Sequence, residues 1–248
     1  EEFGTINFIS TVTEPSLEEI AANSPHPKSF QIYVRGDDDW IKALARRAVD
    51  AGYKSITLTV DSSFYGNRER LSPTQLALRN VPERDFQKGI TWDTVRMVQD
   101  TIGDIPFIVK GIMTAEDAAV AVENQVDCIY ISNHGGRQLD QVYGNIDTLP
   151  EIVKAAGGKT QVIIDGGFTR AGDMLKAIAL GADAVAIGRL QAWALGADNA
   201  PGLVKCLELL EIEIERTMGL LGVTSLDQLD SSYIGPAMPV RLPHEHSA

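Results

Sequence analysis

Short apolar segments rich in β-branched residues alternate along this chain with longer segments in which apolar residues recur at helical spacing. The first pattern is typical of buried strands and the second of amphipathic helices. Strands are predicted at residues 5–10, 29–34, 55–60, 106–110, 127–132, 161–165 and 183–188. Helices are predicted between them near residues 16–23, 38–51, 92–102, 115–124, 146–156 and 171–180. Such regular alternation indicates an α/β protein with a parallel sheet.

The residues at the strand ends decide between an open doubly wound sheet and a closed barrel. Nearly every predicted strand ends in or is followed by a residue suited to chemistry: Ser10, Tyr33, Asp61, Lys110, His134, Asp165 and Arg189. A doubly wound sheet gathers its ligands around one switch point, whereas a TIM barrel collects them from many strand ends. We therefore predict a TIM (β/α)8 barrel.

A TIM barrel has eight strands, and only seven are predicted in this chain. The seventh is followed by a long helix at 201–221 and a tail with several prolines, so no further strand is expected there. We expect the first barrel strand and the N-terminal segment to precede Glu1. Residues 1–248 then form a single barrel domain, with a loop or lid at 67–89 and a C-terminal tail at 230–248. A solvated insertion without a role is the alternative for the loop.

Composition narrows the possible partners. The 248 residues are 44% hydrophobic, enough for one large core, and the net charge of −12 argues against nucleic acid or an anionic membrane surface. A local cluster of Arg or Lys could still bind a small anion. The two cysteines, Cys128 and Cys206, lie in core-like segments, so neither a disulfide framework nor a metal site is expected. No apolar run is long enough to span a membrane and no signal peptide is visible, which makes a cytoplasmic location the default expectation.

The segment SNHGGRQLD, residues 132–140, gives the clearest indication of chemistry. It follows a buried strand, and its two glycines let the backbone approach a ligand closely. His134 can move a proton near neutral pH, and Arg137 can bind a carboxylate through two hydrogen bonds. A base beside an anion-binding group suggests chemistry on a small organic acid.

Two further residues have a physical reason to belong to this site. Asp61 also ends a strand and could pair with His134, which would stabilise the imidazolium and fix the ring orientation. Lys110 ends an apolar strand and needs a partner if it is buried. From the residues alone, a Schiff-base lysine is an open alternative for Lys110.

Seven motifs then point to a family. They are FQIY (30–33), LTVD (58–61), GNRE (66–69), VKG (109–111), SNHGGRQLD (132–140), DGG (165–167) and IGR (187–189). In order and spacing they resemble the FMN-dependent α-hydroxy-acid oxidases and dehydrogenases, such as glycolate oxidase, lactate oxidase and mandelate dehydrogenase. The resemblance covers almost the whole chain and implies FMN as cofactor. It also implies oxidation of an L-2-hydroxy acid to the 2-keto acid, reoxidation by oxygen or another acceptor, and a homo-oligomer, often a tetramer.

The resemblance assigns roles to individual residues. His134 would be the base, oriented by Asp61, while Arg137 and Arg68 would bind the substrate carboxylate and Tyr33 its hydroxyl or keto oxygen. The residues expected to hold FMN are Ser10, Gln31 and Thr59 at the ring, Lys110 at its N1–C2=O edge, Asp165 at the ribityl chain, and Gly167, Arg170, Gly188 and Arg189 at the phosphate. No metal site is implied.

The chain departs from the family pattern at two positions. Thr169 stands where many members have an arginine near the flavin phosphate, although Arg170 follows it, and Val12 stands where glycolate oxidases have a tryptophan. Two other functions stay open: an isomerase built on an FMN- or phosphate-binding barrel, and an incomplete barrel without catalytic activity.

Overall fold

The computed structural model describes residues 2–64, 66, 82–139 and 141–237. In these residues seven parallel strands follow one another in sequence order within one sheet. The strands are β1 (Asn7–Ser10), β2 (Lys28–Ile32), β3 (Ser55–Thr59), β4 (Phe107–Ile112), β5 (Cys128–Ile131), β6 (Gln161–Ile164) and β7 (Ala184–Val185). The predicted parallel α/β sheet is therefore confirmed, with boundaries shifted by one to three residues at the strand ends.

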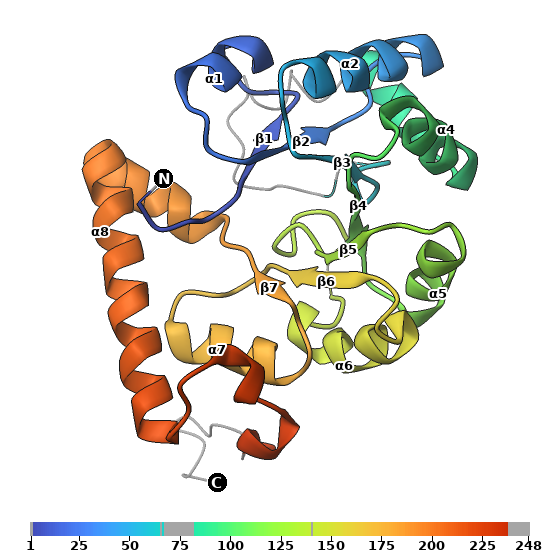
Figure 1. Cartoon of the computed structure of the whole chain (residues 1–248). Helices are drawn as coiled ribbons and strands as arrows, with labels where there is room; N and C mark the ends of the chain where they lie inside the picture. The colour runs from blue at the N-terminus through green and yellow to red at the C-terminus, as the bar shows by residue number, and fades with distance from the viewer. Residues whose placement is uncertain (1, 65, 67–81, 140, 238–248) are drawn as a thin grey trace, which may run out of the picture.

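Helices cover the outer face of the sheet (Figure 1). They are α1 (Leu17–Asn23), α2 (Asp38–Asp50), α4 (Trp92–Ile102), α5 (Ala115–Glu123), α6 (Asn145–Ala156), α7 (Ala171–Ala179) and α8 (Arg189–Leu221), with short 3-10 helices η2 (Pro82–Gly89), η3 (Leu226–Gln228) and η4 (Ser231–Tyr233). Capping residues define their ends: the Thr114 hydroxyl accepts from the backbone N–H of Asp117 at the start of α5, and Gly157 ends α6 in a left-handed conformation.

One expectation about the connections needs correction. The predicted irregular loop at 67–89 is not irregular throughout, because its last part forms η2; residues 67–81 lie outside the described residues.

The helix predicted at 201–221 is present as the second part of α8. A kink at Asp198 and Asn199, whose backbone angles are not helical, divides α8 into two helical parts. Pro201 lies in the first turn of the second part, where its missing N–H has no partner to lose. The first part, which begins at Arg189, was not predicted.

The sheet curls into a barrel that is open between β1 and β7 (Figure 1). The clearest sign is an edge-to-face contact of Phe8 on β1 with Tyr130 on β5, whose ring centroids lie 5.3 Å apart. Strands so far apart in the strand order can touch only if the sheet bends around an interior. That interior is filled by Ile108, Cys128 and Tyr130, with Phe8, Ile163 and Ala186 packed against them. A second, larger apolar layer lies between the sheet and the helices and includes Phe30, Ile32, Ile56, Ile129 and Ile164.

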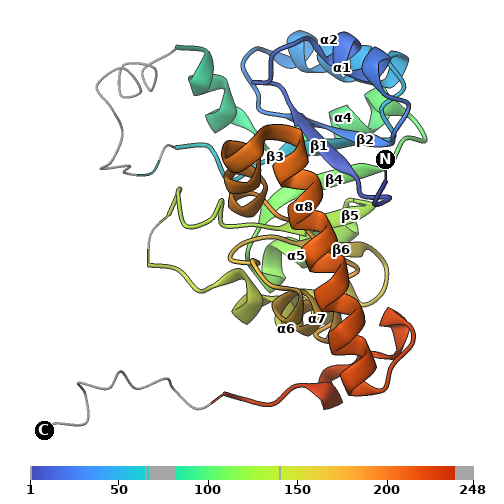
Figure 2. The ribbon, with the colours of Figure 1, turned by 90° about the vertical axis from the view of Figure 1, so that its left-hand side faces the viewer.

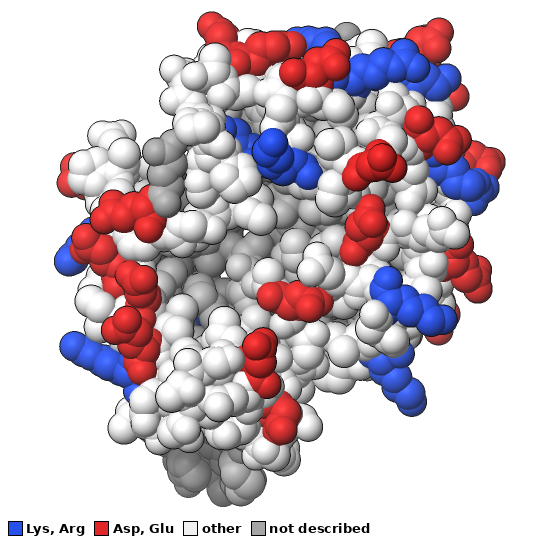
Figure 3. Space-filling view, viewed as in Figure 1, with Lys and Arg blue, Asp and Glu red and all other residues white. Residues whose placement is uncertain are grey.

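The two ends of the barrel differ. The segments that follow β3 and β5 extend from one end, and the N-terminus lies at the other (Figure 2). On the face shown in Figure 3, acidic and basic side chains are both present. Among the described residues, no helix has the length and apolar character needed to cross a bilayer.

Candidate active site

His134 lies in a tight turn at the carboxyl end of β5. Its φ is 58°, and Gly135 and Gly136 follow with φ of 66° and 73°, so three consecutive residues are left-handed. The Ser132 hydroxyl accepts a hydrogen bond from the backbone N–H of His134 at 3.1 Å. A non-glycine residue in this conformation costs about 1–3 kcal/mol, and such residues gather at functional sites. The turn therefore marks His134 as a residue whose placement the surrounding structure enforces.

Asp61 and Tyr33 contact opposite nitrogens of the His134 ring. Nδ1 of His134 lies 3.1 Å from each carboxylate oxygen of Asp61, and Nε2 lies 3.4 Å from the hydroxyl of Tyr33. A proton on Nδ1 is donated to the carboxylate, which leaves the lone pair of Nε2 free to accept a proton. The His134 and Asp61 side chains are only 20% and 10% exposed. The structure thus brings together three of the residues predicted to be catalytic, with the imidazole of His134 held between the other two.

Gly111 makes room for Asp61. The β4–β5 register shifts between Lys110 and Ile112, and Gly111 within this bulge has a φ of 113°. A Cβ at Gly111 would lie 2.7 Å from Cβ of Asp61 and 2.8 Å from its backbone nitrogen. Only glycine permits both this backbone conformation and this close approach.

A buried network joins Lys110, Ser132 and Asp165. Nζ of Lys110 donates to the Ser132 hydroxyl at 2.8 Å and lies 3.5 Å from the Asp165 carboxylate, to which Ser132 donates at 3.0 Å. The partner that a buried lysine requires is therefore a carboxylate of the protein itself. Nζ of Lys110 also lies 4.9 Å from the centre of the Tyr130 ring. Burial, and then the nearby Asp165 carboxylate, raise the pKa of Tyr130 well above its ordinary value, so this phenol stays neutral.

The residues predicted at the flavin ring form a row on the interior face of the barrel. Ser10 is the register partner of Gln31, and Thr59 is the register partner of Lys110. Gln31 is also paired with Thr57, two residues before Thr59, so all four side chains point to the same face. The Thr59 hydroxyl oxygen is buried and has no hydrogen-bond partner within the described residues. A buried polar atom of this kind needs a partner, and a polar ring seated on the row would supply one, so the residues fit FMN.

The predicted phosphate end also fits an anion. Gly167 follows β6 and Gly188 precedes α8, and a Cβ at either position would meet no atom within 4 Å. Because α8 begins at Arg189, its first backbone N–H groups lie beside Gly188, as phosphate sites at helix N-termini require. Arg189 is exposed, and its guanidinium lies 3.2 Å from where a Cβ of Gly135 would be, close to the His134 turn.

The remaining predicted arginines are placed differently. Arg170 is 72% exposed and pairs with Glu213 of α8 at 2.5 Å, so its guanidinium already has a partner. Arg137 is exposed on the loop after His134, and Arg68 lies outside the described residues. Gly66, two residues before Arg68, approaches that loop: a Cβ there would lie 2.1 Å from the carbonyl oxygen of Gln138.

Several polar residues at this end of the barrel were not predicted from the sequence. Besides Ser132, Gln138 donates from its side-chain amide to the carbonyl oxygens of Asp61 and Phe64, at 3.2 Å each. Asn145 donates to the Asp165 carbonyl at 2.7 Å, and its own side-chain oxygen is buried without a partner in the described part of the chain. The position of Ser132 directly after a strand was a usable signal. The other two are recognisable only once distant segments are seen together.

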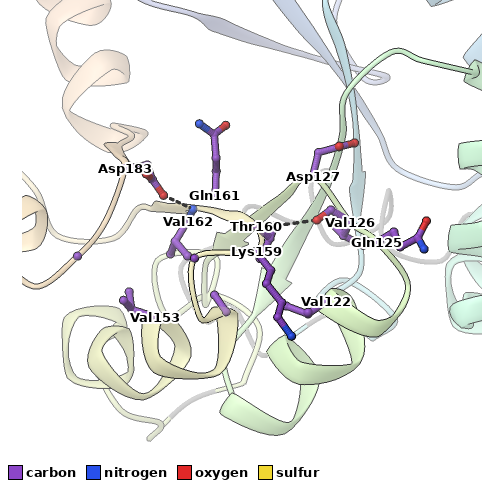
Figure 4. Close-up of a pocket in the computed structure, with 13 residues that line it drawn as sticks. Val122, Gln125, Val126, Asp127, Val153, Lys159, Thr160, Gln161, Val162 and Asp183 are labelled. Atoms are coloured by element: carbon purple, nitrogen blue, oxygen red, sulfur yellow. Dashed lines mark hydrogen bonds between the residues drawn. The ribbon is translucent and has the colours of Figure 1, made fainter.

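A separate cavity of about 640 Å³ lies at the opposite end of the barrel, between α5, α6 and the amino ends of β5 and β6. Gln161 and Lys159 point away from each other there (Figure 4). Asp183 and Asp127 accept hydrogen bonds from the backbone N–H groups of Val162 and Phe107. These carboxylates thus hold neighbouring strands in register, and this cavity is not part of the site around His134.

Comparison with known proteins agrees with this geometry. A model of the FMN-dependent dehydrogenase family matches residues 1–84 and 72–236. L-lactate oxidase of Nostoc sp. is 38% identical over 93% of this chain and 71% of its own length. Glycolate oxidase of Spinacia oleracea is 39% identical over 93% of this chain and 69% of its own length. A crystal structure of mandelate oxidase with (S)-2-phenylpropionate superposes with a TM-score of 0.81 at 40% identity, covering 91% of this chain and 68% of that one.

These matches confirm the family resemblance seen in the seven motifs, and they confirm the barrel fold. The chain belongs to the FMN-dependent dehydrogenase family, the family of the 2-hydroxy-acid oxidases, and FMN is its cofactor.

Proposed function

We propose that this protein oxidises an L-2-hydroxy acid to the 2-keto acid, with His134 as the base. The observation that carries the proposal is the ring of His134 held between Asp61 and Tyr33 at the carboxyl end of β5. The active sites of TIM barrels lie at this end. The relatives named L-lactate oxidase, glycolate oxidase and mandelate oxidase support the reaction class.

The protonation steps follow from the hydrogen bonds. Asp61 holds the proton on Nδ1 of His134, so that Nε2 takes a proton from the substrate. The Asp61 carboxylate then stabilises the imidazolium that forms, and the buried setting strengthens this attraction. Tyr33 donates from its hydroxyl to the substrate oxygen, next to Nε2. Bound FMN would supply the acceptor for the two electrons and the second proton that leave the substrate.

Substrate orientation would come from the arginines. Arg137 lies three residues after the base, on the same loop, and Arg68 is expected from the resemblance to bind the same carboxylate. Two guanidinium groups on one carboxylate fix its direction as well as its affinity, which holds the reacting atoms near Nε2.

The cofactor would be held from two sides. Ser10, Gln31 and Thr59 would bond the polar edge of the ring system, with Lys110 placing its positive charge at the edge that becomes negative on reduction. Asp165 would bond the ribityl hydroxyls, and Gly167, Gly188 and Arg189 would hold the phosphate. Arg170 would reach the phosphate only by leaving Glu213.

Val12 argues for a substrate larger than glycolate. It follows β1 at the site end of the barrel and is 57% exposed, so its small side chain leaves space that a tryptophan would fill. We therefore expect L-lactate or L-mandelate to be turned over faster than glycolate. We also expect oxygen to reoxidise the flavin. A homo-oligomer and a cytoplasmic location stay predictions.

The test is an anaerobic absorbance spectrum of the purified protein before and after addition of L-lactate, L-mandelate or glycolate. Bleaching by one of the acids is expected, and His134→Ala should slow bleaching by about 10²–10⁴-fold, the usual contribution of a general base. A yellow protein that no 2-hydroxy acid bleaches would favour the isomerase alternative. A colourless protein that does not take up FMN would favour the barrel without activity.

A further inference from the structure

We propose that Gln87 is a positioning residue that sets the distance between the two groups on either side of His134. Gln87 belongs to η2 and is 4% exposed. Its side-chain nitrogen donates to the carbonyl oxygen of Thr59 at 2.5 Å, and its side-chain oxygen accepts from the backbone N–H of Val34 at 2.6 Å. One amide thus joins the ends of β2 and β3 from a third segment of the chain.

The two backbone groups need this amide because the strands separate at this point. The last register pair of β2 and β3 is Ile32 with Leu58, so Val34 and Thr59 lie beyond the ladder. The N–H of Val60 takes no part in this rung, because alternate residues of β3 face β4, and it donates to the carbonyl oxygen of Lys110. A glutamine side chain has the donor and the acceptor that replace one rung of a sheet.

The position of this rung connects it to the chemistry. Val34 directly follows Tyr33, and Thr59 comes two residues before Asp61. Tyr33 and Asp61 contact Nε2 and Nδ1 of His134, respectively. A change in the spacing of the two strand ends therefore moves both groups relative to the imidazole. This inference rests on the proposed role of His134 as the base.

The competing explanation is that Gln87 only attaches η2 to the barrel. In that case its loss lowers the unfolding temperature and leaves the catalytic constants per folded molecule unchanged. A positioning role instead requires a loss of kcat, because an error of about 1 Å at a reacting group can cost about a hundredfold in rate.

Gln87→Met separates these explanations, since methionine has a similar volume and makes neither hydrogen bond. The matched control is Asp85→Asn, on the same 3-10 helix, where an exposed carboxylate pairs only with Lys88 in the described structure. In the FMN-loaded protein we expect kcat to fall by about 10–100-fold in Gln87→Met, with a change in KM of less than about threefold. Asp85→Asn should match the parent in both constants.

Gln87→Glu provides a rescue that depends on pH. A protonated carboxyl has one donor and one acceptor, like the amide, whereas an ionised carboxylate faces the carbonyl of Thr59 with no proton to donate. Burial favours the neutral form, so protonation should occur above the ordinary range for Glu. The ratio of variant kcat to parent kcat should therefore rise as pH falls, and no such rise should occur in Gln87→Met.

Proton NMR provides a readout that does not depend on turnover. It detects the downfield resonance of the Nδ1–H of His134, which is hydrogen-bonded to Asp61. We expect it in the parent and in Asp85→Asn, and we expect it to broaden or vanish in Gln87→Met. The proposal is overturned if Gln87→Met keeps both this resonance and a kcat within about twofold of the parent. Should Gln87→Met fail to fold, absence of recovery at low pH in Gln87→Glu overturns it. If no 2-hydroxy acid reduces the parent, the proposed function fails, and the resonance alone decides the role of Gln87.

Discussion

At the scale of single residues, Ser132 uses its whole hydrogen-bonding capacity between the base and the cofactor side of the site. Its hydroxyl accepts from Lys110 and from the His134 backbone and donates to Asp165. Ser132→Ala would leave a buried ammonium with one partner and the His134 N–H with none. We expect a loss of about 2–4 kcal/mol in the free energy of unfolding, measured by urea denaturation.

The matched control for Ser132 is Thr160→Val at the opposite end of the barrel. The Thr160 hydroxyl makes one hydrogen bond, to the carbonyl oxygen of Val126, so its loss should cost only about 1 kcal/mol. Equal effects of the two substitutions would contradict the view that Ser132 holds the network together.

Gly111 is the residue whose absent side chain matters most to the base. Gly111→Ala would push a methyl group against Asp61 and force alanine into a φ of 113°. We expect kcat/KM to fall by about a hundredfold, because the carboxylate that orients His134 must move. Gly172→Ala in α7 is the control, since its Cβ meets nothing within 4 Å. A Gly111→Ala enzyme with parental kcat/KM would show that Asp61 tolerates displacement.

At the scale of elements, the sequence predicted the strands far better than their ends. Central strands are buried on both faces and give continuous apolar runs, as at 128–131, where all four residues are buried. The last strand was predicted as 183–188, but only Ala184 and Val185 pair. It has a neighbour on one side only within the described residues, so fewer hydrogen bonds extend it.

The site was predictable where chemistry follows a strand directly, and not where it depends on distant contacts. His134, Asp61 and Tyr33 each follow a strand, and the structure brings them together. Gln87 contacts residues 53 and 28 positions away in sequence, so no local pattern could reveal it. For the same reason, nothing in the sequence showed that Arg170 is paired with Glu213.

The start of α2 fixes the loop that follows Tyr33. The Asp37 carboxylate accepts from the backbone N–H of Trp40 at 3.0 Å and caps the helix. Asp37→Ala should lower the free energy of unfolding by about 1 kcal/mol, as loss of an N-cap does. Asp39→Ala is the control, because this exposed carboxylate makes only a loose ion pair with Lys42 at 3.8 Å. A larger effect of Asp39→Ala in thermal unfolding would rule out the capping argument.

At the scale of the whole molecule, the side chains that stabilise the barrel and the side chains predicted to carry out catalysis lie in different parts of it. Its outer layer is apolar and so is most of its interior, apart from the hydrogen-bonded pair Ser29 and Thr57. The network of Lys110, Ser132 and Asp165 lies at the carboxyl ends of the strands. Substitutions in the interior should therefore act on folding, and those at the strand ends on catalysis. Of the two titratable groups in this interior, one allows this to be tested through pH alone.

That group is the thiol of Cys128, packed beside Tyr130 inside the barrel. Burial raises the pKa of Cys128 from 9.0 to about 12, so the unfolded chain releases this proton before the folded protein does. The contribution to stability is complete below about pH 9 and is lost as pH rises toward 12, at about 1.4 kcal/mol per pH unit. Tyr130 adds a loss of the same sign at higher pH.

We therefore expect the free energy of unfolding to fall steeply with pH above about 9 in the parent and less steeply in Cys128→Ala. Between neutral pH and about pH 11, the free energy of unfolding should fall by roughly 2–3 kcal/mol less in Cys128→Ala than in the parent. Cys206→Ala is the control, because this thiol is only partly buried and its removal should change the slope less. Identical slopes in parent and Cys128→Ala would mean that hydroxide or solvent reaches the barrel interior, so that Cys128 ionises in the folded protein as readily as in the unfolded chain.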